Sequence, residues 1–408
     1  MPLSNQLAML NVVNRSTLEP TALCNPILSS HLYTVVAANY NMEPHNSLDN
    51  IIKNNFSAEN LREFNRIYYG RENHCELKLK DSSIKASEDN NFEVAAYSFP
   101  ASKEQTRPQR VVRLGTIQHS IVLPTDNTIE EQRQAIFTKV EKIIDVAASE
   151  GVNILCLQET WPMPFFLCTK EKERWSEFAE SAQYGPSTKF LSGLAKKYGM
   201  VIVSPILEKD DNGVWWNSVV VIDENGHYLG KHRKNHLPSV GSFSETSFYS
   251  PGDLGHAVFE TKHAKIAINI CYGRHQALNW LMFAVNGAEV VFNPSATIAE
   301  FGESFWGIEA RNAAIANGYF TCSINRVGTE DFFMENTRSK VTRNYYGSSY
   351  TTAPNGCRTP GLSTNNDGLL ISEVDLNLCR QVKDQWQFHM TGRLDMYAKI
   401  LKNKTSAK

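Results

Sequence analysis

The chain has 408 residues, with 41 Lys and Arg against 43 Asp and Glu, and 42% of its residues are hydrophobic. A chain of this length and apolar content can bury a large core, which argues against extended disorder. The formal net charge of −2 argues against a general nucleic-acid binder, because no excess of positive charge is present to attract phosphates. Its apolar runs, such as 280–285, fall well short of the ~20 residues of a membrane-spanning helix.

The first residues contain neither a basic region nor an apolar core, so no secretory signal is expected. Eight cysteines are scattered without a Cys-x-x-Cys pair, which favours free thiols in a reducing compartment. We therefore expect a soluble, cytoplasmic protein without membrane or nucleic-acid partners. Residues 1–42 are polar and show no sustained period, and we predict that they form a mobile arm.

The segment before residue 111 is predicted to be an extension of the main domain. Ser47–Tyr69 has apolar residues near helical spacing, and Ser57 is a candidate cap for its second half. Asp81–Arg110 is charged and is expected to be a loop, with one short alternating run at Phe92–Phe99. We therefore predict a helical extension and linker at 43–110, a main domain at 111–400 and a tail at 401–408.

Strands and helices alternate along the main domain. Thr128-Ile-Glu-Glu131 fits a capping box, in which the hydroxyl and the carboxylate each accept a backbone N–H at the start of a helix. Asn225-Gly226 indicates a hairpin with a type I′ turn. The predicted strands are 111–117, 152–157, 200–206, 217–222, 227–231, 265–270, 289–292 and 319–324, and the predicted helices follow Thr128 and cover 188–198, 276–286 and 304–317. This alternation predicts a layered α/β sandwich.

Three polar residues stand where predicted buried strands end: Glu159, Lys234 and Cys271. Ligand sites of layered α/β folds tend to lie at strand ends. Each residue also has an ordinary interpretation, since a free cysteine is usually a small buried hydrophobe and a carboxylate or a run of cations is usually solvated. Cys271 is distinguished by a glycine and a cation within three residues, a setting that favours a reactive thiolate.

A metal site is not expected. His232 and His236 are four residues apart, a spacing that suits a metal pair on a helix, but their segment is predicted to be strand or loop. Neither common type of glycine-rich phosphate loop occurs.

Taken together, the segments around the three residues resemble the catalytic motifs of the nitrilase, or carbon–nitrogen hydrolase, family. These segments are Asn153-Ile-Leu-Cys-Leu-Gln-Glu159, His232-Arg-Lys-Asn-His-Leu-Pro238 and Asn269-Ile-Cys-Tyr-Gly-Arg-His275. Stretches such as Phe292-Asn-Pro-Ser-Ala296 and Tyr346-Gly-Ser-Ser-Tyr350 narrow the resemblance to the branch that hydrolyses N-carbamoyl-β-alanine.

The resemblance implies a four-layer α-β-β-α sandwich with an N-terminal helical extension, assembled as a homodimer or higher homo-oligomer and needing no cofactor. It implies hydrolysis of N-carbamoyl-β-alanine, and of N-carbamoyl-β-aminoisobutyrate, to the β-amino acid, carbon dioxide and ammonia. That reaction is the last step of reductive pyrimidine breakdown.

The resemblance also implies roles for individual residues. Glu159 would be the general base, Cys271 the nucleophile that forms a carbamoyl thioester, and Lys234 the cation that stabilises the oxyanion. Glu245 matches a second glutamate of the family that positions the lysine and the substrate.

Arg274 and His275 are the candidates for binding the substrate carboxylate, because a guanidinium can bind a carboxylate through two hydrogen bonds. Tyr272 and Asn293 complete the predicted substrate-binding set. A purely structural alternative for Arg274 is an ion pair with Glu303 or Glu309.

Two other functions remain open. Ser239, Ser242 and Ser244 stand where relatives commonly carry Arg, Asp and Asn, and relatives often have a histidine at Gln276. These departures favour, as the alternative, a related thiol amidohydrolase that acts on another N-carbamoyl or amide substrate. A non-catalytic structural paralogue is the third interpretation, and the intact catalytic set argues against it.

Overall fold

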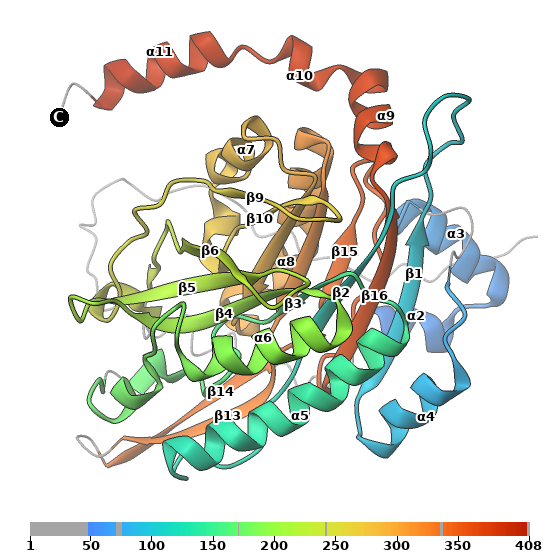
Figure 1. Ribbon diagram of the computed structural model, residues 1–408. Helices are drawn as coiled ribbons and strands as arrows, with labels where there is room; N and C mark the ends of the chain where they lie inside the picture. Colours follow the sequence, from blue (N-terminus) through green and yellow to red (C-terminus); the bar gives the residue numbers. More distant parts are fainter. Residues whose placement is uncertain (1–47, 71–75, 170, 241–242, 335–337, 406–408) are drawn as a thin grey trace, which may run out of the picture. The chain divides into compact units, whose positions relative to one another are not determined.

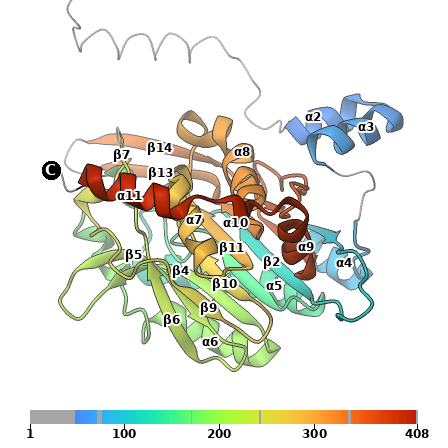
Figure 2. The same ribbon diagram turned by 90° about the horizontal axis from the view of Figure 1, so that it is seen from above.

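The computed structural model describes residues 48–70, 76–169, 171–240, 243–334 and 338–405, so the arm predicted at 1–42 lies outside the described residues. Two β-sheets lie face to face between two layers of helices (Figure 1). Seen from above, α5 and α6 lie on one side of the paired sheets and α7 and α8 on the other (Figure 2).

The first sheet has seven strands in the order β1-β16-β2-β3-β4-β5-β6. In chain order they are β1 (Glu93–Phe99), β2 (Val111–Gln118), β3 (Ile154–Leu157), β4 (Val201–Lys209), β5 (Trp215–Ile222), β6 (Tyr228–Arg233) and β16 (Gly368–Asp375). β2, β3 and β4 are parallel, whereas β4, β5 and β6 form an antiparallel meander. The short β3 is covered on both faces, which explains why all of its residues are apolar and buried.

The second sheet has five strands in the order β15-β12-β11-β10-β9. They are β9 (Val258–Glu260), β10 (Lys265–Ile268), β11 (Val290–Ser295), β12 (Phe320–Asn325) and β15 (Tyr350–Thr352). β10, β11 and β12 are parallel, with Phe292 opposite both Ile268 and Cys322. The carboxyl ends of these three strands therefore lie at one edge of the sheet.

Alternation of side chains along the strands produces the layers. The core between the two sheets includes Leu114, Ile154, Val201, Ile266, Ile268, Phe292 and Phe320. The outer face of the first sheet packs against α5 (Ile129–Ser149) and α6 (Pro186–Tyr198) through Leu155, Leu157, Ile202, Ile144 and Leu191. The outer face of the second sheet packs against α7 (Ala277–Val285) and α8 (Ala299–Asn317) through Ala267, Val291, Phe283 and Trp306. The predicted α-β-β-α sandwich is confirmed.

Shorter elements surround these layers. The helices are α2 (Leu48–Asn55), α3 (Ala58–Tyr68), α4 (Asp81–Asp89), α9 (Asn377–Trp386), α10 (Phe388–Thr391) and α11 (Leu394–Thr405), and the hairpins are β7 (Ser239–Val240) with β8 (Phe243–Ser244) and β13 (Val327–Met334) with β14 (Ser339–Tyr346). Four 3-10 turns, η1 (Phe166–Thr169), η2 (Arg174–Phe178), η3 (Glu245–Ser247) and η4 (Cys271–His275), complete the described elements.

The N-terminal predictions are partly confirmed. The helix expected at Ser47–Tyr69 is two helices, α2 and α3, and Ser57 caps the second by accepting a hydrogen bond from Asn60 N at 3.2 Å. The loop expected at Asp81–Arg110 is wrong in part, because Asp81–Asp89 is helical and β1 belongs to the main sheet. β1 pairs in parallel with β16, with Glu93 opposite Gly368, a partner far along the chain.

Three further predictions concern where an element begins, turns or ends, and each can be compared with the structure. The capping box at Thr128 is confirmed, with Thr128 Oγ1 accepting from Glu131 N at 3.3 Å and Glu131 Oε2 accepting from Thr128 N at 3.1 Å. The hairpin at Asn225-Gly226 is also confirmed, but its turn type is not. Gly226 has a φ of 84° and its N–H donates to Asp223 O, so the turn spans 223–226 with a bulge beside it. At the other end, α11 extends through the first residues of the predicted tail to Thr405.

Candidate active site

The three polar residues at strand ends meet between the two sheets. Glu159 lies two residues beyond β3, Lys234 directly follows β6, and Cys271 lies three residues beyond β10. Glu159 and Lys234 are 75 residues apart in sequence, yet Lys234 Nζ donates a hydrogen bond to Glu159 Oε1 at 2.8 Å. Because β3 and β6 belong to one sheet and β10 to the other, facing sheets bring the base candidate and the thiol together.

The backbone around Cys271 is strained and tightly packed. Cys271 has a φ of 42°, in the left-handed region that residues other than glycine rarely adopt, and it opens the turn η4. Gly273 must lack a side chain, since a Cβ there would lie 2.2 Å from Asn269 Oδ1. Strain of this kind persists only where neighbouring contacts enforce it, and here it turns the thiol away from the line of the strand.

Asn293 contributes to holding this turn. Its Nδ2 donates to the backbone oxygen of Asn269 and, at 3.4 Å, to that of Cys271. Asn293 is fully buried within β11 and lies outside the pocket wall described below. Asn293 therefore supports the backbone of the cysteine turn, and its contact with the substrate stays a prediction.

A buried lysine joins two buried carboxylates beside the cysteine. Lys234 Nζ donates to Glu245 Oε1 and Oε2 at 2.7 and 2.8 Å, in addition to its bond to Glu159. Glu159 Oε1 also accepts from Asn217 Nδ2 at 2.7 Å. Glu159 Oε2 is buried and has no hydrogen-bond partner among the described residues. One carboxylate oxygen is therefore held in place while the other remains able to take a proton.

The charges in this cluster act on one another. Burial and the negative charge of Glu159 raise the pKa of Cys271 to about 11, against the opposing effects of Lys234 and Arg274. Burial by itself would lower the pKa of Lys234, but the negative charges of Cys271, Glu159 and Glu245 hold that pKa above its usual value. Burial, with the negative charge of Glu159, raises the pKa of Glu245 to about 7 against the opposing effect of Lys234. At neutral pH the cysteine is therefore a thiol that needs a base, and Lys234 is a cation.

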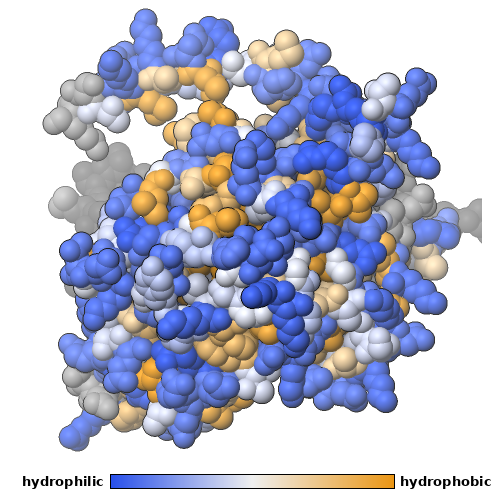
Figure 3. All heavy atoms as spheres, viewed as in Figure 1, coloured by the Kyte–Doolittle hydropathy of each residue, from blue (hydrophilic) through white to orange (hydrophobic). Residues whose placement is uncertain are grey.

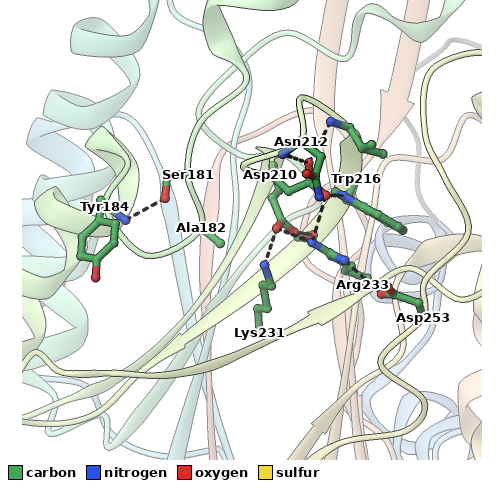
Figure 4. A network of polar contacts seen from close by, with 12 residues as sticks. Ser181, Ala182, Tyr184, Asp210, Asn212, Trp216, Lys231, Arg233 and Asp253 are labelled. Carbon is green, nitrogen blue, oxygen red and sulfur yellow. Dashed lines mark hydrogen bonds and ion pairs between the residues drawn. The ribbon is translucent and has the colours of Figure 1, made fainter.

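The residues that orient Lys234 carry no distinctive sequence motif. Arg233 Nε and Nη2 donate to the buried Glu208 at 3.1 and 2.8 Å, and its Nη1 donates to Asp253 at 3.1 Å (Figure 4). Lys231 binds the same glutamate. The run of cations that resembles a solvated surface is thus a strand end anchored by ion pairs. Asn217 does stand out in the sequence, because an amide within a largely apolar strand can indicate a polar contact in the core, here the hydrogen bond to Glu159.

A pocket of about 130 Å³ opens onto the cysteine. Its lining consists of Pro238, Val240, Glu245, Cys271, Tyr272, Arg274, His275, Ala296, Thr297 and Ile298. The predicted substrate-binding residues other than Asn293 are therefore in its wall. The ring of Tyr272 packs edge-on against that of His275, with centroids 5.0 Å apart.

Arg274 makes the ion pair with Glu309 that was one of its two interpretations, and its side chain also lines the pocket. Its Nε lies 3.2 Å from Glu309 Oε2 on α8, and Glu309 Oε1 is 2.6 Å from His275 Nδ1. Its Nη1 lies 3.9 Å from Cys271 Sγ, and its Nη2 donates to Thr297 Oγ1 at 3.3 Å. One edge of the guanidinium is thus held by a carboxylate, and the other edge faces the sulfur and the pocket.

Two further features of the described residues concern metals and membranes. No group of three or more His, Cys, Asp or Glu side chains in the described ranges could hold a metal ion. His232 lies in β6, where burial lowers its pKa to about 3 and keeps it neutral. Among the described helices, none has the length and apolarity needed to cross a membrane.

The fold and the cluster of thiol, carboxylates and lysine define a class of enzyme, and the family comparison agrees with it. The carbon-nitrogen hydrolase family model matches residues 113–384, and the chain belongs to this family.

Particular relatives can be placed within that class. The chain is 55% identical over 370 residues to a β-ureidopropionase of Arabidopsis thaliana, covering 88% of this chain and 90% of the relative. It is 30% identical over 267 residues to an N-carbamoylputrescine amidase of Solanum lycopersicum, covering 64% of this chain and 88% of the relative. Among solved structures it resembles a carbon-nitrogen hydrolase of Helicobacter pylori, with a TM-score of 0.62, 26% identity, and coverage of 71% of this chain and 98% of the other.

Proposed function

We propose that this protein hydrolyses N-carbamoyl-β-alanine, and N-carbamoyl-β-aminoisobutyrate, to the β-amino acid, carbon dioxide and ammonia. The substrate assignment is supported by the 55% identity to the Arabidopsis thaliana β-ureidopropionase over most of both chains. It is also supported by Arg274, which offers a cation in the pocket wall to an anionic substrate. In this proposal the reaction completes reductive pyrimidine breakdown in the cytoplasm, where free thiols such as Cys271 and Cys156 stay reduced.

In the first half-reaction Glu159 takes the proton of the Cys271 thiol, and the sulfur attacks the ureido carbon. The carbonyl oxygen becomes an oxyanion, which Lys234 and the backbone N–H of Tyr272 stabilise; such a donor is typically worth about 3–4 kcal/mol. The carbon–nitrogen bond to the terminal amide nitrogen then breaks. That nitrogen takes the proton from Glu159 and leaves as ammonia, which leaves a carbamoyl thioester on Cys271.

In the second half-reaction Glu159 takes a proton from water, and the hydroxide attacks the thioester carbon. The carbon–sulfur bond breaks, and the proton on Glu159 returns to the sulfur. The released carbamate loses carbon dioxide and yields the β-amino acid. Water and one ureido substrate thus give one amine, one carbon dioxide and one ammonia.

The observation that supports this mechanism is that the two carboxylate oxygens of Glu159 differ in their hydrogen bonding. Oε1 accepts from Lys234 and Asn217, which fixes the carboxylate, while the buried Oε2 has no partner among the described residues. Buried acceptors are normally satisfied, so an unpaired one beside a thiol is suited to accept its proton. Glu245 holds Lys234 from the other side and so positions the oxyanion donor.

The alternative is another N-carbamoyl or amide substrate. Pro238, Val240 and Glu245 line the pocket, so the departures Ser239 and Ser244 are sequence neighbours of its wall, while Ser242 lies outside the described residues. The N-carbamoylputrescine amidases among the relatives show that the family accepts other carbamoyl amines. An ammonium-bearing substrate would, however, meet Arg274 as a like charge, which favours an anionic one.

The test is the formation of β-alanine and ammonia from N-carbamoyl-β-alanine by the purified protein. A panel of N-carbamoyl β- and α-amino acids, N-carbamoylputrescine, nitriles and simple amides identifies the preferred substrate. Cys271→Ala should bind substrate but release no ammonia. Substantial turnover by Cys271→Ala would refute the thioester mechanism, and preference for another member of the panel would select the alternative.

We also propose that the protein assembles at least as a homodimer. Large apolar side chains are exposed on α8 and on α10 and α11, among them Phe305 (52% exposed), Ile308 (64%), Met390 (70%) and Ile400 (54%). Figure 3 shows apolar side chains along the C-terminal helices at the top of the view. Exposed apolar surface of this extent is typical of protein–protein interfaces.

A further inference from the structure

The loop that carries Glu159 is wound around one buried side chain from the other half of the fold. Arg326, between β12 and β13, is fully buried. Its Nη2 donates to the backbone oxygens of Glu159 at 3.1 Å, Thr160 at 2.9 Å and Met163 at 3.0 Å. A single nitrogen atom thus donates hydrogen bonds to three backbone carbonyls of the segment that follows β3.

The same guanidinium is anchored by a carboxylate that also reaches the loop. Arg326 Nη1 donates to Glu330 Oε1 at 2.7 Å, and Glu330 Oε2 accepts from Phe165 N at 2.7 Å. Both Arg326 and Glu330 are buried, so this ion pair is shielded from solvent. The segment from Glu159 to Phe165 is therefore fixed at its start by the arginine and at its end by the glutamate.

This segment needs external support because its backbone is strained. Thr160 has a φ of 44°, and a β-branched residue in the left-handed region is a steric outlier. Thr160 Oγ1 is buried without a hydrogen-bond partner among the described residues, so the side chain does not stabilise this conformation. Arg326 supplies contacts that enforce it, beside the hydrogen bond from Trp161 N to Pro205 O at 3.3 Å.

Arg326 also links the base to the sheet that bears the nucleophile. It follows β12, and its backbone N–H donates to Ser295 O at the end of β11, two strands of the sheet that includes β10. Glu159 follows β3 of the opposite sheet. Arg326 therefore connects the sheet that leads to Cys271, through its backbone, with the loop that contains Glu159, through its guanidinium.

From these contacts we infer that Arg326, held by Glu330, is a positioning residue that sets the carboxylate of Glu159 against the Cys271 thiol. This inference rests on the proposed role of Glu159 as the base. Proton transfer requires hydrogen-bond reach, and a displacement of about 1 Å can cost on the order of 100-fold in rate. Arginine suits this role because its planar fork places one nitrogen on Glu330 and another on the loop carbonyls, whereas the ammonium of a lysine is a single compact donor group.

The principal variant is Arg326→Lys, which keeps the positive charge beside Glu330 but loses the fork. We expect kcat for N-carbamoyl-β-alanine to fall about 100-fold while KM stays within about threefold, because the substrate-binding wall is unchanged. Alkylation of Cys271 by iodoacetamide, which tests deprotonation of the thiol without substrate, should slow in parallel. Glu330→Gln should show a smaller loss of the same kind, and it serves as the test if Arg326→Lys does not fold.

The decisive variant is Thr160→Gly in the Arg326→Lys background. Glycine adopts a positive φ without strain, so the loop would keep its shape with weaker support, and we expect at least about tenfold recovery of kcat. Arg113→Lys is the control, since Arg113 likewise binds a carboxylate, Glu373 Oε2, and donates to a backbone oxygen, that of Glu150, but lies at the far end of β2. It should lower thermal stability without changing kcat or the alkylation rate.

The outcomes separate this inference from the proposed function. An inactive wild type would refute the proposed function itself. An active wild type with an Arg326→Lys variant of unchanged kcat and alkylation rate would overturn the positioning role. A loss of kcat that Thr160→Gly does not relieve would also overturn it, since the loss would then not come from the strained loop.

Discussion

Replacement of Arg274 by alanine tests how the pocket selects an anionic substrate. The guanidinium is buried, with Nη1 3.9 Å from Cys271 Sγ and Nε 3.2 Å from Glu309 Oε2. Alanine removes the cation that faces the pocket but leaves the contact of Glu309 with His275 Nδ1 at 2.6 Å. The perturbation is therefore concentrated on the side chain that would bind the substrate carboxylate.

The expected magnitude follows from that one contact. A hydrogen bond to a charged group is worth about 1.5–3 kcal/mol, which corresponds to roughly 10- to 150-fold in kcat/KM. In the proposed mechanism Arg274, three residues from Cys271, would also hold the far end of the substrate while the sulfur meets the ureido carbon. Loss of this orientation adds to the binding term, and we expect a loss of at least about 100-fold.

The assay compares two substrates of equal length. Ammonia release is measured for N-carbamoyl-β-alanine and for its uncharged carboxamide, N-carbamoyl-β-alaninamide. Arg274→Ala should lose less than about tenfold on the amide, because no carboxylate is left to bind. Arg274→Lys, which keeps the charge but not the fork, should fall between wild type and alanine. Equal losses on both substrates would show that Arg274 supports the loop and does not bind the carboxylate.

Three further predictions concern the base, stability and assembly. Glu159→Gln should lower kcat by at least about 100-fold, because an amide cannot accept the thiol proton; ammonia release within a few-fold of wild type would mean that the base is misassigned. Burial raises the pKa of Glu180 to about 7. Between the ordinary glutamate pKa of ~4.3 and about 7, the folded protein therefore keeps a proton on this carboxyl group that the unfolded chain has lost. The contribution of this proton to the free energy of unfolding is fully present below pH ~4.3. It is lost as the pH rises through 7, which lowers the free energy of unfolding by an amount on the order of 3 kcal/mol. Glu180→Gln keeps an acceptor for Ser187 N, so chemical denaturation from pH 4 to pH 8 should show a flatter stability profile than wild type; identical profiles would contradict this. Light scattering should give at least twice the 46.0 kDa of one chain, and a monomer at micromolar concentration with or without substrate would contradict the proposed dimer.

The sequence determined the elements and the places where chemistry could occur. Apolar runs such as Ile154–Leu157 form buried strands because burial on both faces leaves no polar position, and this pattern is local. The capping box at Thr128 is local for the same reason. Polar residues that follow such strands, Glu159 and Cys271 among them, can therefore be singled out by their place in the chain alone.

Only the tertiary structure decided which residues support them. Arg326 contacts Glu159 O across 167 residues of sequence, and Lys234 contacts Glu159 across 75. Arg326 follows one strand and Lys234 lies in a run of cations, and neither setting distinguishes a buried, ion-paired side chain from a solvated one. A period of two or of 3.6 residues reports which face of an element is buried. It carries no information on the register and packing that bring two distant faces together, and those decide the ion pairs that shape this site.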